Sequence, residues 1–104
     1  MANTTVTVSI GRAVKGTPMS RGNWIKFQSA VTKLVMANAS DVWVRRSQSN
    51  GEWEDSPEQS RTWVFDLDSS KLELIDDSLN AIRIDFWQDA IARTAGTTRL
   101  IGLE

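Results

Sequence analysis

Hydrophobic and polar positions alternate strictly in TVTVSI, residues 5–10, which is typical of a half-buried strand. In the next ten residues, GRAVKGTPMS, two glycines and a proline predict a loop. The period then changes, because the apolar side chains between residue 21 and about residue 37 fall at helical spacing. Ser20 directly precedes this segment and is a favourable N-cap. The first third of the chain therefore predicts a strand, a loop and a helix.

The remaining pattern predicts four more strands and a second helix. DVWVRRS (41–47) and RTWVFDLD (61–68) are expected strands, and Asn50-Gly51 predicts a turn between them. Residues 69–86 begin with two serines and continue with apolar side chains three, four, three and four apart, which predicts a helix. QDAIART and TRLIGL are expected to be short strands, joined by a turn at Ala-Gly-Thr.

The predicted order is β-α-β-β-α-β-β within a single domain, residues 1–104. Its first six elements match the ferredoxin-like plan, an α+β fold in which two helices cover one face of an antiparallel sheet. Right-handed crossovers then favour the strand order 4-1-3-2. We expect the fifth strand to extend the edge of the sheet beside the fourth.

Strand directions in this topology bring three irregular segments to one end of the molecule. They are the loop after the first strand (11–20), the hairpin between the second and third strands (45–60), and the end of the second helix (87–88). We call this end the loop end. Guanidinium groups, a helix N-terminus and indole rings meet there, and together they suit a phosphate-bearing or aromatic ligand. The candidate ligand-binding residues are Arg12, Lys15, Ser20, Trp53, Glu58, Ser60, Trp87 and Gln88.

Each candidate also has a purely structural interpretation. Arg12 could contact an anion together with Lys15, or it could tie the loop to a carboxylate such as Glu58. Gln88 could read a polar edge of the ligand, or it could hydrogen-bond the strand ends. The acidic residues of the hairpin are most often a solvated turn, and two adjacent acids are weak evidence for a metal or for acid–base chemistry.

The five tryptophans divide into three groups. Trp24 lies on the apolar stripe of the first helix and Trp63 alternates with apolar residues in a strand, so both are expected in the core. Trp43 points to the sheet face that the helices leave open, which predicts a homodimer through that face. Trp53 and Trp87 are the candidates for ligand contact.

The composition restricts the chemistry. The chain has 40% hydrophobic and 24% charged residues, which is typical of a globular protein. It contains no Cys, which excludes a thiol nucleophile, and no His, the side chain that most often transfers protons near neutral pH. No nucleotide-binding glycine motif is present. We therefore expect no cofactor and no metal site, and we favour a protein that is not an enzyme.

The charges are unevenly distributed. Residues 1–50 carry seven basic side chains and one acidic side chain, whereas residues 51–104 carry five basic and twelve acidic side chains. Complementary halves could pack together, or a basic face could meet an anionic partner. The net charge of −1 predicts no bulk attraction to nucleic acid. The sequence shows neither a membrane-spanning run nor a signal peptide, so we expect a cytoplasmic protein.

Several short motifs carry a resemblance. They are a strand ending in Gly, a Ser-x-x-x-Trp-x-x-Phe helix start, a Gly-x-Trp turn, a Glu-x-Ser strand start and a Gln-x-x-Ile strand. The corresponding residues are Gly11, Ser20, Trp24, Phe27, Gly51, Trp53, Glu58, Ser60, Gln88 and Ile91. With these motifs the chain resembles a group of small uncharacterised proteins of bacteria and bacteriophages. The resemblance implies the ferredoxin-like fold and a phage origin, in which case the location is the host cytoplasm; it implies no activity.

Three functional hypotheses follow. The first is a non-enzymatic binding protein that holds a small anionic ligand or nucleotide at the loop end, for example to sequester a host signalling nucleotide. The second is a protein–protein interaction module that blocks a host protein through the acidic hairpin or the sheet face around Trp43. The third is a small dimeric enzyme with the ferredoxin-like fold.

Overall fold

The computed structural model describes residues 3–14, 17–53, 56–88 and 90–96, and it describes their side chains except at 45–53 and 56–58. The elements in chain order are β1 (Asn3–Gly11), β2 (Ala13–Val14), β3 (Thr17–Pro18), α1 (Arg21–Asn38), β4 (Asp41–Trp53), β5 (Ser56–Asp68), the 3₁₀ turn η1 (Ser69–Lys71), α2 (Leu72–Asp85) and β6 (Ala92–Gly96).

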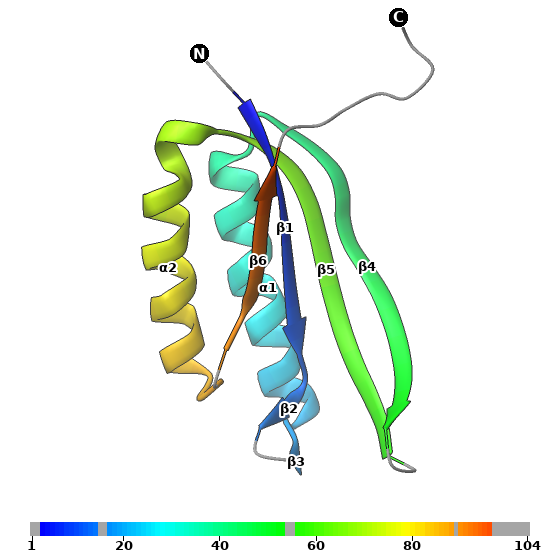
Figure 1. The fold of residues 1–104 in the computed structure, drawn as a ribbon. Coiled ribbons are helices and arrows are strands. Elements are labelled where there is room, and N and C mark those ends of the chain that lie inside the picture. The colour runs from blue at the N-terminus through cyan, green and yellow to red at the C-terminus, as the bar shows by residue number, and fades with distance from the viewer. Residues whose placement is uncertain (1–2, 15–16, 54–55, 89, 97–104) are drawn as a thin grey trace, which may run out of the picture.

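The main sheet has the order β4-β5-β1-β6, and every neighbouring pair is antiparallel. Both helices lie on the same side of this sheet (Figure 1). β1 is a central strand, hydrogen-bonded to β5 on one side and to β6 on the other. The fold is α+β and ferredoxin-like, and the predicted strand order 4-1-3-2 is confirmed.

The core lies between the sheet and the helices. Alternate side chains of β1 and β5 point toward the helices, which bury one stripe each. The buried apolar side chains are Val6, Val8, Ile10, Met19, Trp24, Phe27, Val31, Val35, Trp63, Phe65, Leu67, Ile75 and Leu79. The prediction that Trp24 and Trp63 belong to the core is confirmed. Trp63 also donates a hydrogen bond from Nε1 to Thr32 Oγ1 over 3.1 Å, so the one polar atom of its buried side chain has a partner within the protein.

Side-chain oxygens cap the first turn of α1 and of η1. Ser20 Oγ accepts a hydrogen bond of 3.2 Å from the backbone N–H of Asn23, as the sequence predicts for the N-cap of α1. At η1, Asp68 Oδ1 accepts from both the backbone N–H and the hydroxyl of Ser70. These hydrogen bonds, the backbone one first, lower the pKa of Asp68 below its ordinary value.

The hairpin between β4 and β5 is longer than the sequence pattern predicts. Asn50 pairs with Gln59 and Gly51 pairs with Glu58, so the predicted Asn50-Gly51 turn is wrong, and both residues lie within β4. The pairing continues to Trp53 opposite Ser56. The local Asn-Gly preference for a turn is overridden because both flanking segments find partners in the ladder.

Two other predictions need correction. Residues 11–20 are not only a loop, since β2 and β3 pair within them through Ala13 with Pro18 and Val14 with Thr17. The fourth strand of the main sheet begins at Ala92 instead of Gln88, and it continues through Gly96, where a turn was expected. The predicted fifth strand, TRLIGL, lies outside the described residues. In the part of the chain that the structure describes, no helix is long and apolar enough to cross a membrane.

Candidate functional site

The loop end is assembled as the strand directions predict. The end of β1, the β2–β3 hairpin, the start of α1, the outer part of the β4–β5 hairpin and the end of α2 all lie at the lower end of the molecule in Figure 1. Hydrogen bonds join these segments: the backbone N–H of Arg12 donates to Gln59 O over 3.0 Å, and Gln88 Nε2 donates to Ala13 O over 3.4 Å. Segments from distant parts of the chain are thus held together by hydrogen bonds at this end of the molecule.

Arg12 acts as a brace at this end of the molecule. Its Nε donates to Met19 O over 2.9 Å, and its Nη1 donates to Gln59 Oε1 over 2.7 Å. The backbone N–H of Met19 donates in turn to Arg12 O over 3.0 Å. Arg12 thus ties the loop to β5, but the described partner is the amide of Gln59 instead of the predicted carboxylate, and a contact of Arg12 with an anion stays a prediction. The backbone carbonyl of Met19 and the side-chain amide of Gln59 are both neutral, so they orient the guanidinium without cancelling its charge.

Arg12→Ala is expected to lower the free energy of unfolding by about 1–2 kcal/mol, because two part-buried acceptors lose their donor. Urea denaturation measures the change. The exposed Arg21, in the first turn of α1, supplies the control, and Arg21→Ala should change stability by less than about 0.5 kcal/mol. Equal effects of the two substitutions would contradict the bracing role. A loss of ligand binding in Arg12→Ala must therefore be read against this loss of stability.

The other predicted site residues have mixed outcomes. Gln88 is buried and its amide bonds Ala13 O, so its structural interpretation holds. Ser20 caps α1, and Ser60 pairs with Gly11 in the sheet. Lys15 lies outside the described residues. Of Trp53 and Glu58 the structure gives the strand pairing and not the side chains.

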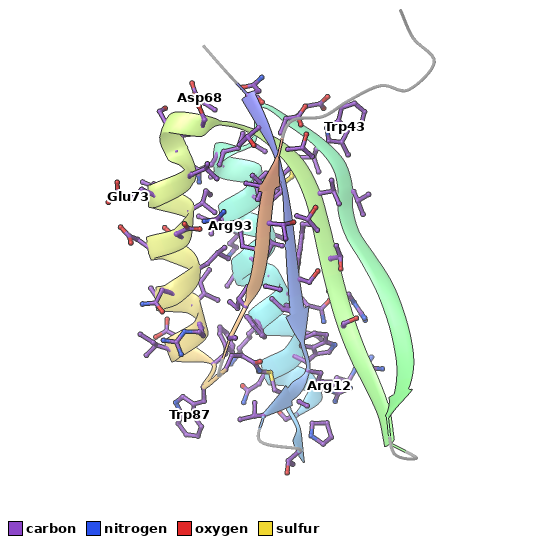
Figure 2. The ribbon with its side chains drawn as sticks, in the orientation of Figure 1. Arg12, Trp43, Asp68, Glu73, Trp87 and Arg93 are labelled. Carbon is purple, nitrogen blue, oxygen red and sulfur yellow. The ribbon has the colours of Figure 1, made fainter. Side chains whose placement is uncertain are left out.

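Trp87 differs from these residues, because packing does not explain its backbone conformation or the position of its side chain. Its side chain is 79% exposed, and its φ of 57° lies in the left-handed region. The backbone N–H of Trp87 donates to Ile84 O over 3.1 Å, and that of Gln88 donates to Arg83 O over 3.0 Å. This is the Schellman ending of α2, in which the left-handed position is usually glycine. Figure 2 shows the Trp87 side chain directed away from the protein at the loop end.

A polar cluster under α1 was missed by the sequence reasoning. Arg61 Nε donates to the buried Gln28 Oε1 over 3.1 Å, and Arg61 Cζ lies 5.5 Å from the centre of the Trp24 ring. Trp24 Nε1 is buried and has no hydrogen-bond acceptor among the described residues. The strand alternation is the signal that could have found Arg61, because residue 61 shares the helix-facing parity of Trp63 and Phe65.

Metal ligands do not gather in the described part of the chain. Among its residues, no three His, Cys, Asp or Glu side chains lie close enough together to hold a metal ion.

Comparison with known proteins bears on the fold. No protein-family model matches the sequence, and no curated protein matches it. Among solved structures, the chain is similar to a phage SAM lyase in complex with S-methyl-5'-thioadenosine, with a TM-score of 0.54 and 15% sequence identity. The match covers 91% of this chain and 81% of that protein. At this identity the likeness shows a shared fold.

Proposed function

We propose that this protein binds a small adenosine-bearing ligand at the loop end, of the class to which SAM and S-methyl-5'-thioadenosine belong. The ligand's adenine ring stacks on the indole of Trp87. The anionic part of the ligand, where it has one, meets the guanidinium of Arg12.

The observation that carries this proposal is the combination of exposure and backbone strain at Trp87. A large aromatic side chain in the left-handed conformation costs roughly 1–2 kcal/mol, and a residue that is 79% exposed recovers little of this by packing. Strained, exposed residues of this kind occur at ligand-binding positions. Stacking of a base on an aromatic side chain contributes about 1–3 kcal/mol, which is large enough to offset the strain.

Arg12 supplies the polar half of the proposed site. Its guanidinium is held by Met19 O and Gln59 Oε1, and none of the described carboxylates pairs with it. A charge held in place by neutral groups is free to form a charge-assisted hydrogen bond with an incoming anion. Because SAM has a carboxylate and S-methyl-5'-thioadenosine has none, SAM is the tighter ligand.

The likeness to the phage SAM lyase supports the adenosine class of ligand and brings in a second candidate function, cleavage of SAM. The SAM carboxylate itself can attack the carbon γ to it, and the carbon–sulfur bond then breaks with its electron pair passing to sulfur. The products are a lactone and S-methyl-5'-thioadenosine, and no proton is transferred. This reaction needs no thiol or imidazole, so a chain without Cys and His is compatible with it.

The homodimer belongs to the same proposal. Trp43 is 57% exposed on the edge strand β4, at an irregularity of the β4–β5 pairing between Val42 and Val44. An exposed aromatic on an open sheet face supports a second copy as its cover.

Native mass spectrometry with added SAM, S-methyl-5'-thioadenosine or methionine tests the ligand and the oligomeric state together. We expect complexes with the first two compounds, tighter binding of SAM by calorimetry, and none with methionine, which lacks the adenine ring. Chromatography of the SAM mixture distinguishes binding of SAM without turnover from cleavage of SAM, since cleavage releases S-methyl-5'-thioadenosine. Failure of both adenosine compounds to bind at millimolar concentration would refute the proposal.

A further inference from the structure

A hollow lies between α2 and the segment that leads into β6, and neither Trp87 nor Arg12 lines it. Its volume is about 300 Å³. Figure 1 shows β6 running beside α2 along this side of the molecule. The wall on α2 is formed by Asp76, Leu79, Asn80 and Arg83, which follow one another at helical spacing on one face. We call this hollow the α2–β6 pocket.

The strand side of the pocket follows from the sheet register. Arg93 pairs with Val8, whose side chain is buried on the helix-facing side of the sheet. Residues opposite each other in a strand pair point to the same face, so the Arg93 side chain extends toward α2. Ile91, two residues earlier, packs against the core and forms the apolar part of this wall.

One end of the pocket is closed by an ion pair. Arg93 Nε donates to Asp76 Oδ1 over 2.7 Å, and Arg93 Nη2 donates to Asp76 Oδ2, so the contact is bidentate (Figure 2 labels Arg93). The hydrogen bonds to Asp76 raise the pKa of Arg93 above its ordinary value. The two charges balance each other, and neither is left for a ligand.

Arg83 at the other end is in a different situation. Its Nε donates to Asn80 Oδ1 over 3.0 Å and its Nη1 donates to Gln88 O over 3.0 Å. Both acceptors are neutral, and no described carboxylate pairs with Arg83. The guanidinium is thus fixed from two sides while its positive charge remains uncompensated within the described lining.

We infer that the α2–β6 pocket binds a small organic anion, whose carboxylate pairs with Arg83 and whose apolar body lies against Leu79 and Ile91. Leu79 and Ile91 both line the pocket; Leu79 belongs to the core and Ile91 packs against it, so the apolar part of the lining is aliphatic. The volume of about 300 Å³ lies at the lower end of the range of small-molecule pockets. This inference does not depend on the proposed function, because the loop-end ligand is held at Trp87 and Arg12.

Benzoate is a suitable probe, and benzamide, which has nearly the same shape and no charge, is its matched control. Titration of the full ¹⁵N-labelled chain, followed by ¹H–¹⁵N spectra, should move the signals of Asn80, Ala90 and Ile91 with benzoate and leave them in place with benzamide. Arg83→Gln should weaken benzoate binding at least tenfold, whereas Arg21→Gln, an exposed arginine of α1, should not change it.

A second variant keeps the test informative if Arg83→Gln disturbs the end of α2. Ala90 is exposed and lines the pocket, so Ala90→Trp should obstruct the hollow with a large side chain while Arg83 itself is retained. It should abolish the benzoate shifts while SAM binding at the loop end stays as in the parent protein. Equal shifts with benzoate and benzamide, or benzoate binding unchanged in Ala90→Trp, would overturn the inference.

Discussion

Phe27→Ala is expected to lower the free energy of unfolding by about 3–5 kcal/mol, the usual cost of removing a fully buried phenylalanine. The ring is completely inaccessible to solvent and joins the two helices. It meets Trp24 edge-on at 6.1 Å between centroids, and it stacks on Phe86 at 5.0 Å with an interplanar angle of 16°. Truncation therefore removes aromatic contacts within α1 and to the end of α2 as well as buried area.

Guanidinium denaturation followed by tryptophan fluorescence measures this loss. A domain of this size is usually stable by about 5–15 kcal/mol, so Phe27→Ala should remove a large share of the stability of the fold. Ile25→Ala is the matched control, because Ile25 lies two residues away on α1 and is 53% exposed. It should cost less than about 1 kcal/mol. A cost below about 1.5 kcal/mol for Phe27→Ala would mean that the helix layer is not packed as described.

Trp87→Gly is expected to move stability and binding in opposite directions. Glycine adopts a φ of 57° without steric cost, so the substitution should raise the free energy of unfolding by about 1 kcal/mol. The same substitution removes the proposed stacking surface, worth about 1–3 kcal/mol, and should weaken SAM binding by roughly 5- to 150-fold. If Trp87 served only packing, its replacement by glycine would instead lower the free energy of unfolding of the protein.

Thermal denaturation and calorimetric titration with SAM measure the two effects in one preparation. Trp87→Phe is the control, since phenylalanine keeps both the backbone strain and an aromatic face. It should leave stability nearly unchanged and retain part of the affinity. If Trp87→Gly is less stable than the parent protein, the strain argument fails. If it binds SAM as tightly as the parent does, Trp87 is not the stacking residue.

The sequence predicts the elements with a strong period best. The first helix was expected from residue 21 to about 37 and extends from Arg21 to Asn38, because Ser20 defines its start and four buried apolar side chains define its stripe. The strand order was correct because crossover handedness leaves few alternatives. The extent of the hairpin was not predictable from its own residues. RRSQSNGEW does not alternate, and its strand conformation follows from pairing with β5.

The location of the loop end could be predicted from the sequence, but the hydrogen bonds and backbone conformations within it could not. Strand direction alone brings Arg12 and Gln88 to the same end, but their hydrogen-bond partners depend on side-chain geometry that no spacing encodes. The conformation of Trp87 runs against the residue preference for its position, so sequence statistics predict glycine there. The α2–β6 pocket does have a sequence signal, namely polar residues 76, 80 and 83 on one face of α2, which becomes informative only once β6 is known to lie opposite.

The central position of β1 has a consequence for how the chain folds during synthesis. Both of its sheet neighbours come from the second half of the chain, β5 from residue 56 onward and β6 from residue 92 onward. A growing chain therefore exposes β1 with neither edge paired until β5 has emerged, and its apolar face is fully covered only when both helices have been made. β6 is the last strand of this sheet that the structure describes, so a chain interrupted before Ala92 leaves β1 as an open edge, the geometry that favours aggregation.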